Sequence, residues 1–300
     1  MVSLCPLTSA WCLQSLDRST PSSREYAASM EAFIIPSSGS AMNAYMYIAA
    51  GLGPHPVALL LHGFPGNEQN GDLAQALRSN GFNALVFHYR GSWGSHGAFS
   101  FSNAVQDVHA ALHFLRAPEQ TRKFRIDPDR IYLIGHSMGG LLAAIVFAKD
   151  SQVRGLAYLS GWNATREVST WNGAELQSVL KDFSESMGPL RGTTPRALVK
   201  DARSHQAKWN LEALAPQMAG RPVLVTAADY DTDTPKEVHQ QPLVDALRAA
   251  HAQSLAYHIL PSDHEYSDAR VELIAIVTDW LRELASATAE TPSKSADDSQ

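Results

Sequence analysis

The stretch IYLIGHSMGG, residues 131–140, places a serine between glycines where two apolar runs meet. The branched and aromatic residues 131–134 are typical of a buried strand, and LLAAIVFA at 141–148 is typical of a buried helix. A tight turn between such elements forces its central residue, Ser137, into an unfavourable backbone conformation. Gly135 and Gly139 remove the side chains that would collide in such a turn.

This G-x-S-x-G pattern predicts a nucleophile elbow. The hydroxyl of Ser137 would project from the C-terminal edge of a sheet, and the next helix would point its free N–H groups at anything bound there. The alternative is a serine that caps a helix at a glycine-rich turn. The strong strand before the motif and the strong helix after it favour the elbow.

Strand-like and helix-like segments alternate on both sides of this motif. The pattern predicts a mostly parallel sheet of about eight strands with helices on both faces. Ser102 is expected to cap the second helix, and Thr234 with Glu237 has the features of a capping box. Strands are expected at 31–37 and 43–50 (a hairpin), 56–64, 83–90, 130–137, 153–161, 221–229 and 255–263, and helices at 70–81, 102–117, 138–149, 234–251 and 269–285.

Residues 162–219 are too long for a simple connection and contain helical patterns of their own. We expect them to form a helical cap inserted after the strand at 153–161. The alternative is a second packing layer with no role at the site. A single domain is expected over 30–286, with a disordered or non-native extension at 1–29 and a disordered tail at 287–300.

A serine hydroxyl is a weak nucleophile unless a base takes its proton and an acid orients that base. Both partners must follow later strands on the same sheet edge. His264 comes just after the last expected strand and is the candidate base. The segment AADYDTDTP offers Asp229, Asp231 and Asp233 as the acid. One oxyanion donor should be the backbone N–H of Met138, directly after the nucleophile.

Over about residues 31–286 the chain resembles the α/β-hydrolase superfamily, and within it the stand-alone esterase domains of prolyl-oligopeptidase-like and dienelactone-hydrolase-like type. ADYDTDTP is similar to the family's G-x-x-D-x-x-V-P pattern, with alanine for glycine and threonine for valine, which favours Asp231. Asp229 and Asp233 stay open as alternatives. HGFPG at 62–66 resembles the H-G-x-x-G loop, which implies Phe64 N–H as the second oxyanion donor and a structural role for His62.

Aromatic residues follow two of the expected strands. RGSWG at 90–94 resembles the R-G-S-x-G stretch of prolyl-oligopeptidase-like domains. Trp93, Phe99 and Trp162 are therefore candidates to line a substrate pocket, and ordinary packing is the alternative for each.

The composition excludes several classes of protein. A formal net charge of −6 gives no reason to expect nucleic acid as a partner, and no apolar run approaches the roughly 18 residues of a membrane span. Cys5 and Cys12 are the only cysteines, which favours a reducing, cytoplasmic location. No nucleotide-binding motif occurs, and His109 and His113 lack the glutamate of an H-E-x-x-H zinc site, so neither a cofactor nor a metal is expected.

These features predict a serine hydrolase that cleaves a small carboxylic ester through an acyl-enzyme. A peptidase or amidase of prolyl-oligopeptidase-like type is the alternative. A non-catalytic binding protein on the same scaffold is a third possibility, although such proteins often lose the residues that are present here.

Overall fold

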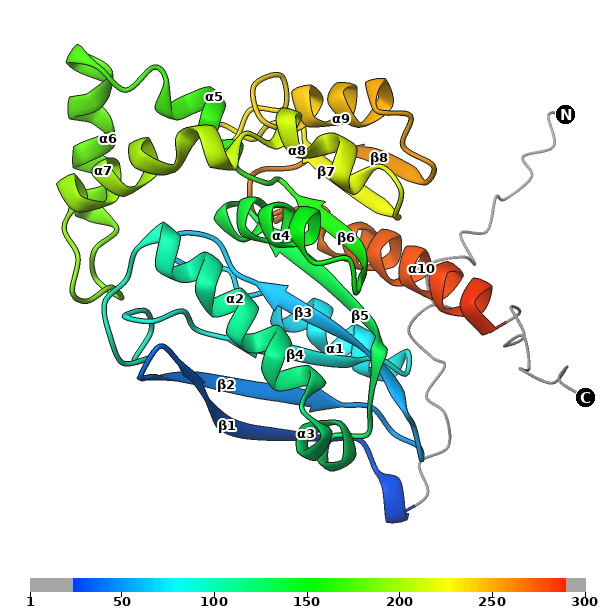
Figure 1. Ribbon diagram of the computed structural model, residues 1–300. Coiled ribbons are helices and arrows are strands. Elements are labelled where there is room, and N and C mark those ends of the chain that lie inside the picture. The colour runs from blue at the N-terminus through cyan, green and yellow to red at the C-terminus, as the bar shows by residue number, and fades with distance from the viewer. Residues whose placement is uncertain (1–23, 290–300) are drawn as a thin grey trace, which may run out of the picture.

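A computed structural model of the chain describes residues 24–289. Eight strands form one sheet in the order β1-β2-β4-β3-β5-β6-β7-β8 (Figure 1). β1 pairs with β2 and β2 with β4 in antiparallel fashion, and every other neighbouring pair is parallel. The strands are β1 (Ser29–Ser37), β2 (Ser40–Ile48), β3 (His55–Leu61), β4 (Asn83–Phe87), β5 (Ile126–His136), β6 (Val153–Leu159), β7 (Val223–Ala228) and β8 (Leu255–Leu260).

The predicted mostly parallel sheet and its opening hairpin are confirmed. β3, β7 and residues 131–134 of β5 are buried, nearly continuous apolar runs, as expected for parallel strands that helices cover on both faces. α2, α4, α8 and α9 contribute to the core on one face, and α1 and α10 to the core on the other. The helices are α1 (Gly71–Ser79), α2 (Phe101–Arg116), α3 (Pro118–Lys123), α4 (Met138–Lys149), α5 (Ala164–Val168), α6 (Gly173–Glu185), α7 (Pro195–His205), α8 (Leu211–Met218), α9 (Gln240–Ala249) and α10 (Arg270–Ala289).

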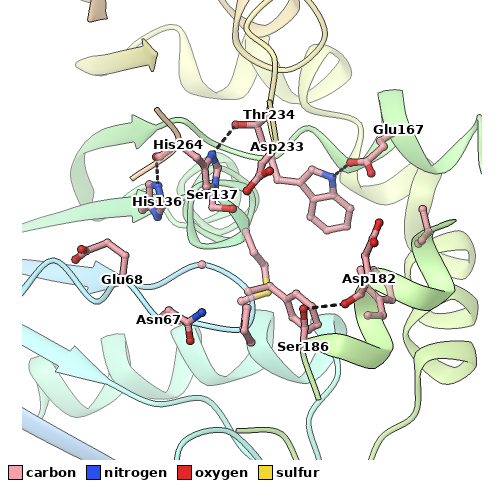
Figure 2. A pocket seen from close by; sticks show the side chains of 18 of the residues that line it. Asn67, Glu68, His136, Ser137, Glu167, Asp182, Ser186, Asp233, Thr234 and His264 are labelled. Carbon is pink, nitrogen blue, oxygen red and sulfur yellow. Dashed lines mark hydrogen bonds between the residues drawn. The ribbon is translucent and has the colours of Figure 1, made fainter. Parts of the chain in front are cut away.

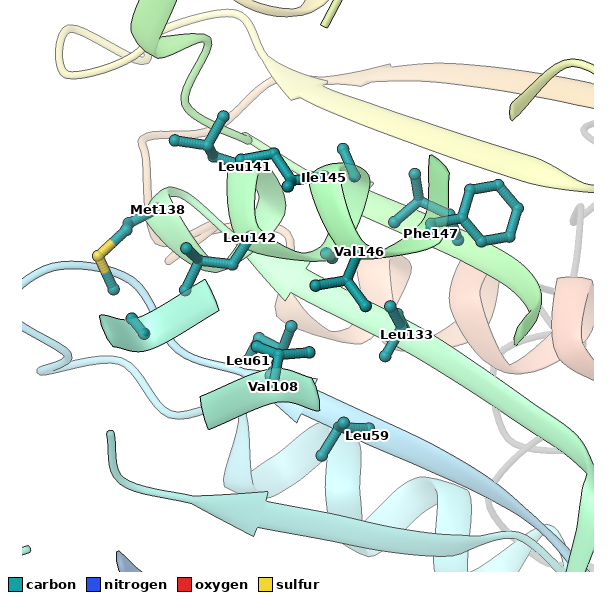
Figure 3. Packing of buried hydrophobic residues seen from close by; sticks show 14 of the residues in the cluster. Leu59, Leu61, Val108, Leu133, Met138, Leu141, Leu142, Ile145, Val146 and Phe147 are labelled. Carbon is teal, nitrogen blue, oxygen red and sulfur yellow. The ribbon is translucent and has the colours of Figure 1, made fainter. Parts of the chain in front are cut away.

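The helix α4, which follows the G-x-S-x-G motif, lies at the centre of the larger core (Figure 3). Residues 138–147 are all buried, so the helix is apolar on every side. Figure 3 shows Leu142 and Val146 on the side of α4 that faces Leu133 of the sheet and Val108 of α2. Packing on all sides leaves α4 little freedom to tilt or shift, which fixes the position of its N-terminus.

The segment between β6 and β7 holds α5 to α8 and a short 3-10 helix, Gln206–Trp209. α8 packs against α4 and α9. α6 and α7 pack against each other and extend past the N-terminal end of α4 (Figure 1). Thr194 caps α7 through its side chain, and Pro195 occupies the first turn.

Two local predictions at helix starts are wrong. Ser100, and not Ser102, caps α2 by accepting a hydrogen bond from Asn103 N at 3.0 Å. Ser102 lies inside the helix, where its hydroxyl donates to Asp201. Thr234 caps no helix, because its side chain and backbone N–H are both bound to Asp231, and α9 begins only at Gln240.

Ordered structure extends slightly beyond the boundaries expected from the sequence. Residues Arg24–Tyr26 form a 3-10 turn, and Gly51 N donates to Tyr26 O at 2.9 Å. β1 starts at Ser29, and α10 continues to Ala289. Most of the expected extension and tail, including Cys5 and Cys12, lies outside the described residues. Between residues 24 and 289, none of the helices combines the length and apolarity that crossing a membrane requires.

Candidate active site

Ser137 occupies a strained turn between β5 and α4. Its backbone angles, φ 56° and ψ −122°, lie in a region that residues with a side chain rarely adopt. Backbone hydrogen bonds hold the turn on both sides: Ser137 N donates to Leu159 O at 3.0 Å, and Trp162 N donates to Ser137 O at 2.8 Å. The neighbouring strand β6 therefore fixes the backbone of the serine.

Two glycines allow the turn to pack this closely. A Cβ atom on Gly135 would lie 2.1 Å from Gly139 O, and one on Gly139 would lie 2.0 Å from Leu61 O. Both separations are far shorter than van der Waals contact. The close approach of α4 to the end of β3 places Ser137 beside the loop that follows β3. A Cβ on Gly63 of that loop would lie 2.9 Å from Ser137 Cβ.

Asp231 and His264 form a buried, hydrogen-bonded pair. Nδ1 of His264 donates to Asp231 Oδ2 at 2.8 Å. The other carboxylate oxygen, Oδ1, accepts the backbone N–H groups of Asp233 at 2.9 Å and Thr234 at 2.7 Å. Asp231 follows β7 and His264 follows β8, so the parallel pairing of these strands brings the two side chains together.

These contacts favour the charged form of both groups. Burial alone would raise the pKa of Asp231, but the hydrogen bond and charge of His264, together with Thr234, lower it to about 2. Burial would lower the pKa of His264, but the hydrogen bond and charge of Asp231 outweigh it, and the charges of Asp233 and Glu265 add to the effect. The pKa of His264 is consequently raised above its ordinary value of 6.5.

Two further polar residues, Thr234 and His136, hold this pair in place. The Thr234 hydroxyl lies 2.7 Å from Asp231 Oδ2, 3.0 Å from Ser160 O and 3.2 Å from His264 Nδ1. His136 donates from Nε2 to the backbone oxygen of His264 at 2.8 Å, as Figure 2 shows. Burial lowers the pKa of His136 to about 3, so this ring is neutral at ordinary pH. The position of His136 beside Ser137 in the motif was the only sequence signal for such a role.

The loop 62–66 is held against the serine by its own contacts. His62 is buried, and its Nδ1 donates to Gly63 O at 2.8 Å. Burial lowers the pKa of His62 to about 3, which leaves the ring neutral. Trp93 Nε1 donates to Pro65 O at 2.8 Å from the outer side of the loop. His62 and Trp93 thus hold the loop that carries Phe64.

A cavity of about 500 Å³ connects these elements. Ser137 and His264 lie on the same side of it, and Glu167 and Asp182 lie across from them (Figure 2). No hydrogen bond joins Ser137 Oγ to His264 within residues 24–289, and such contacts commonly tighten when substrate binds. The cavity is lined by residues 63–68, Phe101, residues 136–138, Trp162, Glu167, Trp171, Glu175, Val179, Asp182, Phe183, Ser186, residues 232–234, His264 and Glu265.

Of the three aromatic side chains expected at the pocket, Trp162 lines the cavity. Trp93 does not, because its indole is turned to the outer side of loop 62–66. Phe99 is buried behind the wall, with its ring centroid 5.9 Å from those of Phe64 and Phe101. Phe101, two positions further along the chain, takes the place expected for Phe99.

The carboxylates across from Ser137, and Phe183 beside them, were missed at the sequence level. The cavity-lining positions 175, 179, 182 and 183 of α6 recur at the spacing of one helix face. Glu167 of α5 also lines the cavity and accepts hydrogen bonds from two indole N–H groups, those of Trp162 and Trp171. The helical period was visible, but no local pattern indicated which face meets the cavity.

The scan against protein families matches residues 58–295 to the model described as the alpha/beta hydrolase family. The chain belongs to the alpha/beta hydrolase family. An uncharacterized protein of Mycobacterium tuberculosis is 29% identical over 229 residues, which cover 75% of this chain and 69% of that protein. The curated relative therefore supports common ancestry without supplying an activity.

Solved structures of the same fold include an esterase and a peptidase. Est1E from Butyrivibrio proteoclasticus has a TM-score of 0.64 and 18% identity, over 85% of this chain and 99% of that chain. The acylaminoacyl peptidase of Pyrococcus horikoshii has a TM-score of 0.66 and 14% identity, over 90% of this chain and 43% of that chain. Their likeness supports the fold, and the family supports a hydrolase.

Proposed function

We propose that this hydrolase cleaves carboxylic esters through an acyl-enzyme formed on Ser137. His264 acts as the general base and acid, and Asp231 orients it. The observation that carries the proposal is the buried Asp231–His264 hydrogen bond of 2.8 Å beside the strained turn at Ser137, with serine and histidine on one cavity. Such a pair supplies what a serine hydroxyl lacks: a base of correct tautomer and an acid that stabilises its charged form.

In the proposed reaction, Ser137 Oγ attacks the ester carbonyl carbon while Nε2 of His264 takes the hydroxyl proton. Asp231 keeps the histidine proton on Nδ1 and stabilises the imidazolium. The backbone N–H groups of Phe64 and Met138 hold the oxyanion. Collapse of the tetrahedral intermediate expels the alcohol, which takes the proton from His264. Water then attacks the acyl-enzyme by the same proton transfers, releasing the acid and restoring Ser137.

Features of the chain itself support each role in this reaction. Asp231 stabilises the imidazolium that forms on proton transfer, and the raised pKa of His264 reflects this stabilisation. The contact between Gly63 and Ser137 supports the assignment of Phe64, because it brings loop 62–66 to the nucleophile. A cavity of about 500 Å³ suits a small-molecule substrate.

The test is turnover of p-nitrophenyl esters of two to eight carbons, together with labelling by a fluorophosphonate probe. Ser137→Ala is expected to abolish both. Ser186→Ala is the matched control, because Ser186 also lines the cavity but lies directly after α6, away from Ser137. Full labelling of the Ser137→Ala protein would remove Ser137 from the proposed role, as would equal losses in the two variants.

Amide cleavage is the alternative function, supported by the R-G-S-x-G-like stretch at 90–94 and by the peptidase among the structural neighbours. Aminoacyl p-nitroanilides measured beside the esters separate the two functions. The esterase is supported if the ratio of kcat/KM for the esters to that for the anilides is well above the ratio of their uncatalysed hydrolysis rates. Comparable or faster anilide turnover would make the protein an amidase with the same nucleophile.

A further inference from the structure

The cavity wall across from Ser137 has no assigned function, yet its chemistry is unusual. It combines aromatic rings with a carboxylate that is largely withdrawn from solvent. Trp162 and Trp171 stack with ring centroids 6.3 Å apart and an angle of 17°, and Phe183 meets Trp171 edge to face at 5.8 Å. All three rings line the cavity, and so does Glu167.

Glu167 is held firmly but its charge is not balanced. Both carboxylate oxygens accept indole N–H groups, Oε2 from Trp162 and Oε1 from Trp171. In the described part of the chain no lysine, arginine or histidine forms a salt bridge with it. Burial raises the pKa of Glu167 and the indole hydrogen bonds lower it, while the charges of Glu175 and Asp182 add to the rise.

Apart from two histidines, the ionisable side chains that line the cavity are all carboxyl groups. The lining contains six carboxyl groups and two histidines, and neither lysine nor arginine. His136 is neutral because of burial, and His264 belongs to the proposed reaction. A ligand that enters this space therefore meets several carboxyl groups and several aromatic side chains. The carboxyl groups are those of Glu68, Glu167, Glu175, Asp182, Asp233 and Glu265.

We propose that the wall formed by Trp162, Glu167 and Trp171 binds a cationic group of the substrate, such as an ammonium or quaternary ammonium. This inference rests on the proposed ester hydrolysis and names its substrate class. Indole faces attract cations through the ring quadrupole, and the half-buried carboxylate gains the counter-charge it lacks. A neutral substrate of the same shape would fill the cavity but leave Glu167 without compensation.

The hydrogen bonds from Trp162 and Trp171 to Glu167 strengthen the proposed binding of a cation. An indole whose N–H donates to a carboxylate is more electron-rich than a free indole, which raises the attraction of its face for a cation. Glu175 and Asp182 lie on the same face of α6 at the exposed side, where they add attraction that salt can screen. The preference for a cation should therefore have two components: a part due to Glu167 that resists salt and a part due to Glu175 and Asp182 that does not.

The experiment compares kcat/KM for substrate pairs of equal shape that differ in charge. One pair places the charge on the alcohol: choline butyrate and 3,3-dimethylbutyl butyrate. The other places it on the acyl group: the p-nitrophenyl esters of 4-(trimethylammonio)butyric acid and 5,5-dimethylhexanoic acid. We expect the cationic member of at least one pair to be preferred by about tenfold or more, as a desolvated cation–π contact beside a carboxylate allows.

Three variants assign the preference to residues. Glu167→Gln retains a hydrogen-bond acceptor but removes the charge, and should lower the cationic-to-neutral ratio to the part that Glu175 and Asp182 contribute, which high salt then removes. Glu175→Gln with Asp182→Asn should lower the ratio about two- to fivefold and remove its salt dependence. Glu185→Gln is the matched control on the same helix: it lies outside the cavity and pairs with Lys181, so the ratio should stay unchanged.

A ratio near one in the native protein, with measurable ester turnover, would overturn this inference and leave the proposed function intact. A high ratio that survives both Glu167→Gln and the double variant would also overturn it. If Glu167→Gln fails to fold, the preference that remains in the double variant decides: a cationic-to-neutral ratio that stays above one and no longer changes with salt supports the wall, and a ratio near one refutes it. If no ester is cleaved, calorimetric titration with benzyltrimethylammonium decides: binding that weakens in Glu167→Gln supports the cation site, and absence of binding to the native protein refutes it.

Discussion

Replacement of Asp231 by asparagine tests the proposed reaction at its best-defined contact. Oδ1 of Asp231 accepts two backbone N–H groups, so the asparagine oxygen should remain there. The amide NH₂ would then replace Oδ2 and face His264 Nδ1 at the present 2.8 Å. Two donors cannot share that contact, so the histidine should move its proton to Nε2, the atom that must accept the proton of Ser137.

The size of the effect follows from the same geometry. Unit charges 2.8 Å apart attract by roughly 6 kcal/mol at an effective dielectric constant of about 20, which is an upper limit for the pair. Loss of one partner of a buried pair typically costs about 3–5 kcal/mol, because the charge that remains is left buried without compensation. We therefore expect kcat to fall roughly 10²–10⁴-fold, with little change in KM.

Steady-state hydrolysis of p-nitrophenyl butyrate measures the loss, with circular dichroism to verify folding. Asp229→Asn and Asp233→Asn are the matched controls. Asp229 is partly exposed and pairs with Lys236 at 2.9 Å, so its replacement should leave kcat within about twofold. Asp233 raises the pKa of His264 by its charge alone, so its replacement should lower that pKa slightly. A folded Asp231→Asn protein that retains more than a tenth of native kcat would refute this reasoning.

Three further outcomes follow from the geometry. In a pH series, kcat/KM should rise with increasing pH through an apparent pKa above 6.5, because only neutral His264 can accept a proton and Asp231 raises its pKa; a midpoint below 6.5 would contradict this. Thr234→Val keeps the shape but removes the hydroxyl beside Asp231, and kcat/KM should fall about 5- to 20-fold while the thermal midpoint drops by a few degrees, as loss of a hydrogen bond to a charged group implies. An unchanged rate would show that the backbone N–H of Thr234 suffices. Gly139→Ala puts a Cβ 2.0 Å from Leu61 O, so the elbow must move by about 1 Å and ester turnover should fall at least about 100-fold; native turnover in this variant would show that the elbow tolerates the shift.

The order of strands and the position of the elbow could be predicted because both leave strong local signals. The run before Gly135 and the run after Gly139 are apolar over a full strand and a full helix, and no competing interaction alters them. The hairpin of β1 and β2 was equally visible, since Gly39 marks its turn. Long periodic segments determine their own structure, and tertiary contacts only adjust their ends.

The errors occur where tertiary contacts override a local pattern. Thr234 resembles a helix cap in sequence, but Asp231 offers its side chain and backbone stronger partners, and the helix begins six residues later. Trp93 follows a strand that borders the site, yet its indole finds a carbonyl acceptor on the outer side of the neighbouring loop. The short helix α3 was not predicted, because six residues are too few for a periodic signal.

The residues that line the cavity likewise depend on tertiary contacts that no local pattern reveals. Glu167 and Phe183 come from separate helices of the insertion, and which helix face meets the cavity depends on how α5 and α6 dock. The sequence contains the two tryptophans that bind Glu167, but a contact between residues 162, 167 and 171 requires the turn between the helices to close. Chemistry at the serine could thus be anticipated, whereas the character of the opposite wall could not.

The strand order of the sheet has a consequence for how the protein folds. β7 and β8, which are followed by Asp231 and His264, form one edge of the sheet and come last along the chain. His136 and His264, which are hydrogen-bonded, are 128 positions apart, so this edge can dock only after a long loop has closed. After dilution from denaturant, the rate of ester hydrolysis would measure this last docking step. It would recover more slowly than the circular dichroism signal of the helices.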